Sequence, residues 1–124
     1  MSEQVTLQLT EIVGSTLCVA SEDGQKVYEQ ISQALLDGRQ IQLSFLNVES
    51  LTSAFLNTAI GQLYGEFPEE LLKNSLSVIK IDNTDVTLLR RVIETAKLYF
   101  SNPEAFNSAH EHVLGDGDDE EYDA

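Results

Sequence analysis

The chain has 124 residues, and it contains a single cysteine, two prolines, no tryptophan and few positive charges. The lone Cys18 cannot form an internal disulfide, and no cysteine or histidine cluster surrounds it. No apolar run approaches the length of a membrane span, and no basic stretch followed by a long apolar one opens the sequence. Because 42% of the residues are apolar, most of the chain can fold around a core. We therefore expect one folded domain in the cytoplasm.

Positive charge is scarce, with 7 Lys and Arg against 21 Asp and Glu, and the net charge is −14. Phosphate backbones and anionic lipid surfaces repel such a chain, which argues against nucleic acid and membrane partners. Six of the acids lie in the last ten residues, GDGDDEEYDA. Without these six, the remaining 15 acids still exceed the 7 bases by eight, so the body is acidic as well.

Apolar residues recur with the periods of strands and helices along the first 103 residues. The order strand, strand, helix, strand, helix, strand, helix predicts an α/β fold with a mostly parallel sheet of four to five strands and helices packed on it. A turn at 14–15 would join the first two strands in an antiparallel hairpin. The predicted strands span about 5–9, 16–20, 39–48 and 76–81, and the predicted helices about 25–36, 50–67 and 85–100.

The pattern fades beyond Pro103, where a proline stops the last predicted helix. The segment EAFNSAHEHVL is compatible with one weak helix, and an acidic, glycine-containing tail follows it. We expect the tail to be disordered. The predicted organisation is thus an α/β domain over 1–103 and a weak helix with an acidic tail over 104–124.

The junction between a predicted strand and the following helix, NVESLTSAF, is the main candidate site. Its hydroxyls either cap the helix or form a regulated site, and the residues leave both alternatives open. Acid and amide groups also follow the next strand, and the carboxyl ends of parallel strands meet at one edge of a sheet. The candidate partner-binding or regulatory residues are Asn47, Glu49, Ser50, Thr52, Ser53, Phe55, Asp82 and Asn83. Phe55 is either a core residue or an exposed anchor.

Other sequence features give weaker signals. His110 and His112 precede the acidic tail and could bind a metal, but stray histidines in such a tail are commoner. Cys18 lies in an apolar run and is expected in the core. Arg90 and Arg91 are the only adjacent basic pair. Since no catalytic triad or phosphate-binding loop stands out, we expect a protein without catalytic residues, metal site or cofactor, and therefore not an enzyme.

Two segments carry a resemblance to a known family: LDGRQIQLSFLNVESLTSAFLNTAIGQLYGEF and SLSVIKIDNTDVTLLRRVIETAKLYFSNP. Together with the region of Gly24, they resemble the STAS-like domain family of unknown function. That family is similar to the anti-sigma factor antagonists of bacteria. The resemblance covers roughly residues 20 to 103, and it implies a STAS-like fold, a bacterial source and a regulatory role.

In anti-sigma factor antagonists, the strand-to-helix junction carries an Asp-Ser-Ser-Gly-like motif whose first serine is phosphorylated by a partner kinase. Thr52 stands at the position of the aspartate, and Ser53 stands at that of the phosphorylated serine. Ala54 and Phe55 replace the second serine and the glycine. The resemblance therefore implies Ser53 as the candidate phosphorylation site.

Three functions compete on these grounds. The first is a non-enzymatic, STAS-like regulatory module that binds a partner protein, such as a kinase-like ATPase. The second is a small-ligand or nucleotide sensor. The third is an acidic subunit or inhibitor of a larger assembly, and self-association is compatible with all three.

Overall fold

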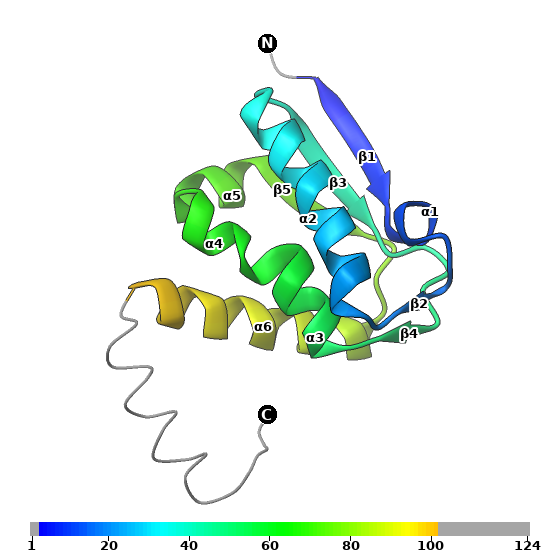
Figure 1. Cartoon of the computed structure of the whole chain (residues 1–124). Coiled ribbons are helices and arrows are strands. Elements are labelled where there is room, and N and C mark those ends of the chain that lie inside the picture. Colours follow the sequence, from blue (N-terminus) through cyan, green and yellow to red (C-terminus); the bar gives the residue numbers. More distant parts are fainter. Residues whose placement is uncertain (1–2, 102–124) are drawn as a thin grey trace, which may run out of the picture.

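Three parallel strands form the main sheet in the computed structural model, which describes residues 3–101 (Figure 1). They are β1 (Gln4–Gln8), β3 (Gln40–Ser44) and β5 (Leu76–Ile79), with β3 in the centre. The register places Val5 beside Ile41 and Leu43 beside Val78. The prediction of an α/β fold with a parallel sheet is therefore confirmed.

The predicted hairpin is wrong, because a short helix, α1 (Leu9–Val13), follows β1. Gly14 ends this helix in the left-handed conformation, with φ 80°, and its N–H donates to the Thr10 carbonyl at 2.9 Å. The chain is thereby turned away from β1. The next strand, β2 (Leu17–Cys18), pairs in parallel with β4 (Ser50–Leu51) in a separate sheet. The five strands of the described residues are thus divided between sheets of three and two strands, so the predicted single sheet of four to five strands is not observed.

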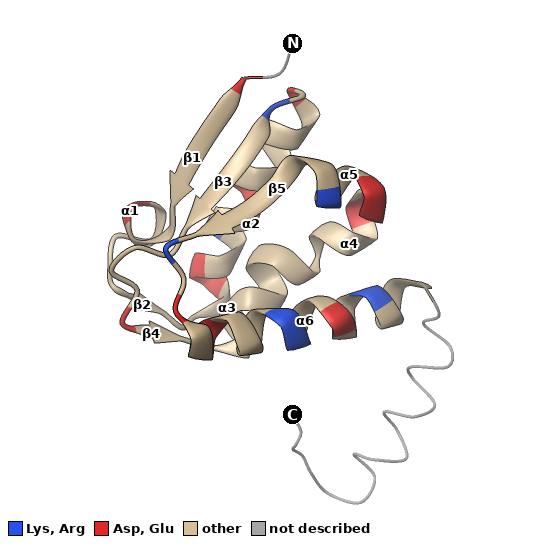
Figure 2. Ribbon diagram, turned by 180° about the vertical axis from the view of Figure 1, so that it is seen from behind, with Lys and Arg blue, Asp and Glu red and all other residues tan. Residues whose placement is uncertain are grey.

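The helices lie on one side of the main sheet, and the view from behind shows β1, β3 and β5 in front (Figures 1 and 2). On β3, Ile41 and Leu43 are buried, whereas Gln40 is exposed. The last helix packs mainly on other helices. The remaining helical elements are α2 (Ser21–Leu36), α3 (Ser53–Leu56), the π-helix η1 (Asn57–Gly61), α4 (Leu63–Glu66), α5 (Glu69–Ser75) and α6 (Asn83–Ser101).

Helix α2 begins at Ser21, four residues earlier than the sequence pattern indicated. Glu22 and Asp23 lie in its first turn, where negative charge is favourable. Gly24 is buried inside the helix, and a Cβ atom built there would lie 2.5 Å from the Phe55 carbonyl oxygen. Gly24 therefore lets α2 and α3 approach closely and does not break the helix.

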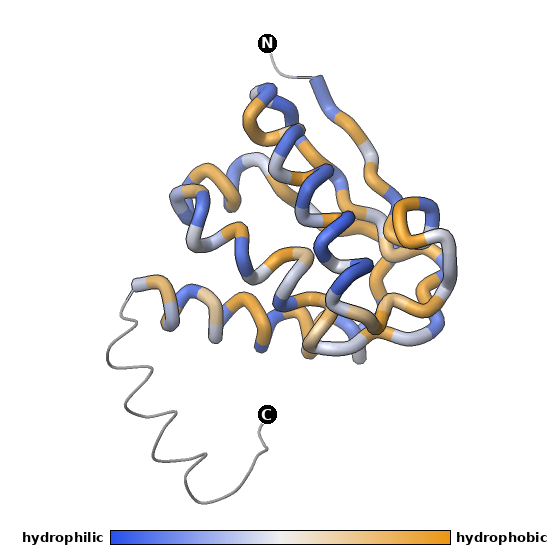
Figure 3. Tube along the Cα trace, in the orientation of Figure 1, coloured by the Kyte–Doolittle hydropathy of each residue, from blue (hydrophilic) through white to orange (hydrophobic). Residues whose placement is uncertain are grey.

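The predicted helix over 50–67 is observed from Ser53 to Glu66, but it is widened in the middle. The backbone N–H of Gln62 donates to the Asn57 carbonyl, five residues back, at 3.1 Å. The Gln62 side-chain amide donates to the bypassed Thr58 carbonyl at 2.8 Å. Apolar and polar residues are interspersed along this stretch (Figure 3).

The core of the domain is made of side chains from the sheet and from the helices. It includes Leu9, Ile31, Leu43, Phe55, Leu56, Ile60, Leu63 and Leu89.

No helix in the described part of the chain is long and apolar enough to cross a membrane. The predicted weak helix and acidic tail over 104–124 lie outside the described residues.

Candidate functional site

The loops that follow β3 and β5 leave the main sheet at the same end, where the carboxyl ends of the parallel strands lie, as predicted. The Phe45 N–H donates to the Ile79 carbonyl at 3.0 Å, which joins the ends of these two strands. The first loop then turns at Asn47, whose φ of 67° is left-handed, a conformation that asparagine tolerates. Asn47, Glu49 and Ser50 are all exposed along this loop and β4.

Thr52 caps the helix that starts at Ser53. Its hydroxyl accepts from the Phe55 N–H at 3.1 Å and donates to the Val19 carbonyl at 2.8 Å. The first bond satisfies a free N–H of the helix, and the second joins the cap to the end of β2. Capping, one of the two alternatives for these hydroxyls, is thus observed at Thr52.

Ser53 is exposed as the first residue of α3. Within residues 3–101 its hydroxyl makes no hydrogen bond, so a modifying enzyme could approach it. Phe55 differs, because its side chain is 0% exposed and belongs to the core. The prediction of Phe55 as a partner-binding residue is therefore wrong, since its place on the apolar face of the helix buries it.

Asp82 begins α6. Its carboxylate accepts from the Asp85 N–H at 3.1 Å, and its backbone carbonyl accepts from the Val86 N–H at 2.9 Å. Burial raises the pKa of the Asp85 carboxyl above its usual value, and the negative charge of Asp82 raises it further. Asn83, the first residue of α6, is exposed beside these two acids.

An open hollow lies between β4 and the first half of α6. Leu51 contributes from β4, and α6 contributes side chains at helical spacing. We name this hollow the β4–α6 surface, and its lining residues are Leu51, Asn83, Thr84, Asp85, Thr87, Leu88 and Arg91. Of the predicted candidates only Asn83 lines it, although Leu51 lies between the candidates Ser50 and Thr52. The two predicted loops are therefore brought together.

Arg91 and Asp85 are the two charged side chains of this surface, and Arg91 is the one that sequence reasoning did not place there. Arg90 and Arg91 are both exposed, and neither forms an ion pair with any described residue. Lys97 is different, since its Nζ lies 3.0 Å from the Glu69 carboxylate. Arg90 lines a second hollow on α6, together with Ile93 and Lys97. The two arginines therefore line different hollows.

The charge of α6 is opposite to that of the protein as a whole. The helix carries three bases against Asp85 and Glu94, and two of the bases are arginines without an ion pair to any described residue. It is the only helix of the described region with more bases than acids (Figure 2).

Cys18 is a core residue, as predicted. Its side chain is 0% exposed, and burial, with a smaller contribution from Asp23, raises the pKa of the thiol to about 11. A thiol with this pKa stays protonated at neutral pH and is a poor nucleophile. Within residues 3–101, no group of three or more His, Cys, Asp and Glu side chains is placed to hold a metal ion. His110 and His112 lie outside the described residues.

A family model matches residues 23–86 of this α/β chain, and its description is "STAS-like domain of unknown function (DUF4325)". The match covers half of the chain, and the chain belongs to this family. The matched segment runs from the first turn of α2 to the first turn of α6, so it contains both loops described above. No curated protein and no solved structure matches the chain.

Proposed function

We propose that this STAS-like domain is a non-enzymatic regulatory module that binds a partner protein through the β4–α6 surface. The observation that carries the proposal is Arg91, an exposed arginine that forms no ion pair within residues 3–101 and lies beside two half-buried leucines, Leu51 and Leu88. Apolar contact area next to an arginine is a common composition for the centre of a protein interface.

The chemistry of this surface indicates what the partner presents. A guanidinium binds a carboxylate through two parallel hydrogen bonds, and it is less strongly hydrated than an ammonium group. Leu51 and Leu88 would cover an apolar side chain next to that carboxylate. The net charge of −14 disfavours acidic partners elsewhere on the protein, so Arg91 also fixes where such a partner docks. A kinase-like ATPase remains the partner class implied by the family resemblance.

Ser53 provides a means to regulate this binding. It is exposed and lies two residues beyond Leu51, which lines the surface. A phosphate on Ser53 would add a charge of about −1.5 to −2 near the place where the acidic group docks. We propose that phosphorylation weakens binding by repulsion. Ser53→Asp should then lower the affinity, whereas Ser53→Ala should keep it, and equal affinities would rule out the switch.

Site-specific photo-cross-linking in cells tests the module proposal. A photoreactive residue replaces Thr87 on the β4–α6 surface in one variant, and Gln42 on the open face of the main sheet in the control. We expect one protein to be captured through position 87 and not through position 42. Capture of nothing from position 87, or of the same proteins from both positions, would contradict the proposal.

A further inference from the structure

Among residues 3–101, no strand pairs with the outer edge of β1, which leaves a set of backbone groups unused. In this part of the chain, β1 pairs with β3 alone. The Gln40 N–H donates to the Glu3 carbonyl at 2.8 Å, so Glu3 points its backbone groups toward β3. The backbone groups of successive residues point to alternate sides of a strand. The N–H and C=O groups of Val5 and Leu7 therefore also point toward β3, and those of Gln4 and Thr6 point toward the free edge. Figure 1 shows this edge at the outside of the sheet.

The edge strand has none of the features that usually prevent pairing with another chain. Its sequence, QVTLQ, contains no charge and no proline, and none of its residues has positive φ. The opposite edge differs, because Lys80 follows β5 directly with a left-handed φ of 60°, which ends the strand beside a charge. A neutral, regular edge such as β1 is a template for strand pairing.

We propose that β1 pairs antiparallel with β1 of a second copy of this chain, about a twofold axis at Thr6, and that this joins two sheets into one of six strands. The strand is self-complementary about that residue. Thr6 meets Thr6 of the second copy, Val5 meets Leu7, and Gln4 meets Gln8. A twofold interface requires such self-complementarity. Because Thr6 points its N–H and C=O outward, the central pair would exchange two hydrogen bonds.

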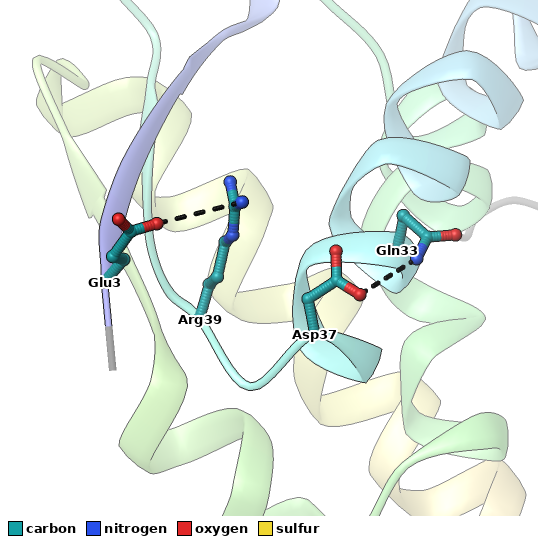
Figure 4. A network of polar contacts seen from close by, with 4 residues as sticks. All are labelled: Glu3, Gln33, Asp37 and Arg39. Atoms are coloured by element: carbon teal, nitrogen blue, oxygen red, sulfur yellow. Dashed lines mark hydrogen bonds and ion pairs between the residues drawn. The ribbon is translucent and has the colours of Figure 1, made fainter. Parts of the chain in front are cut away.

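The charge distribution favours this place for self-association. Two chains that each carry a net charge of −14 repel each other, so close approach requires a neutral contact. The strand itself is neutral, and the Glu3 carboxylate at its start lies 3.8 Å from the Arg39 guanidinium (Figure 4). Val5 and Leu7 are half-buried and would gain cover from the second copy.

The size of the contact sets the expected strength. A strand of five residues is about 17 Å long, so its pairing gives an interface smaller than the roughly 1,200 Å² of stable complexes. The dimer should therefore be weak and should form at high protein concentration. It does not involve the β4–α6 surface, so Arg91→Glu should leave it unchanged.

Sedimentation of the full chain over a range of concentrations measures the association. The wild type should shift toward twice the monomer mass as the concentration rises. Thr6→Pro removes the outward N–H that the second copy would use, so it should abolish the shift. The substitution removes no hydrogen bond of the main sheet, because that N–H has no partner within the sheet. Thr6→Val keeps the N–H and should behave like the wild type. A wild type that stays monomeric throughout would overturn the proposal.

Cysteine cross-linking tests the register independently of Thr6→Pro. Under mild oxidation, Thr6→Cys should form a covalent dimer, because paired residues at the axis lie within disulfide reach. Gln4→Cys is the matched control on the same edge, and its mate would lie about 13 Å away along the strands. The wild type should not cross-link, since Cys18 is buried. Absence of the Thr6→Cys dimer, or equal cross-linking by Gln4→Cys, would overturn this arrangement.

Discussion

The side-chain amide of Gln62 connects two helical elements that are distant in sequence. Its nitrogen donates to the Gln25 side-chain oxygen at 2.9 Å and to the Thr58 carbonyl at 2.8 Å. The Thr58 carbonyl lacks its usual helical donor, because the Gln62 N–H bonds to Asn57 instead. Gln62 therefore completes the π-helix and holds it against α2.

Gln62→Ala should lower the free energy of unfolding by about 1–2 kcal/mol, because the Thr58 carbonyl and the Gln25 side chain both lose a donor. Gln30→Ala is the control, since Gln30 is exposed on α2 and its side chain makes no hydrogen bond to any described residue. It should change the stability by less than about 0.5 kcal/mol. Chemical denaturation measures both variants, and equal small effects would show that the Gln62 bonds contribute nothing.

Gly24→Ala should destabilise the protein by about 1–3 kcal/mol, because the new methyl group would lie 2.5 Å from the Phe55 carbonyl oxygen and force the helices apart. Gly61→Ala is the matched control. At that position the nearest atom to the new methyl group lies at 3.7 Å, and alanine is the better helix former. Thermal melts should therefore show a loss for the first variant and no loss for the second. A Gly24→Ala protein as stable as the wild type would refute the close packing.

Thr52→Val should cost about 1–2 kcal/mol of stability. Valine fits the extended backbone at this position but lacks the hydroxyl that accepts from Phe55 and donates to Val19. Thr52→Ser keeps the hydroxyl and should stay close to the wild type. If denaturant unfolding gives the same midpoint for the valine and serine variants, the cap is not stabilising.

The buried thiol of Cys18 should make stability fall in alkaline solution. In the unfolded chain the thiol ionises near its ordinary pKa of 9.0, whereas the folded protein keeps it protonated up to about 11. The unfolded state therefore loses a proton first, and the free energy of unfolding decreases as the pH rises from about 9 to about 11. Cys18→Ala should show a smaller decrease over this range. An identical slope for both proteins would contradict the raised pKa.

The sequence was sufficient to predict the parallel sheet and the helix that follows β3. Both depend on local periodicity, which one face of a sheet or helix imposes along the chain. The pairing of β2 with β4 was not predictable in the same way, since β2 is only two residues long and Cys18 pairs with Leu51, more than thirty residues later. Its pairing depends on Gly14 and α1, which direct the chain away from β1.

The candidate site was predicted in part. The edge of the sheet and the loops were expected, because parallel strands end together. Arg91 was noted as half of a basic pair but was not placed at this site, since the face of α6 that meets β4 is set by its packing on α3, η1 and α4. The spacing of Thr84, Thr87, Leu88 and Arg91 on one helix face is the signal that could have indicated it.

The central claim is that a partner docks on the β4–α6 surface through Arg91. Isothermal titration of the protein captured through position 87 tests this directly, with wild type, Arg91→Glu and Arg90→Glu compared. Both substitutions reverse the same charge on adjacent residues of one helix, but only Arg91 lines the surface. We predict that Arg91→Glu weakens binding by about tenfold or more and Arg90→Glu by about twofold or less. Equal losses, or a larger loss from Arg90→Glu, would contradict the account.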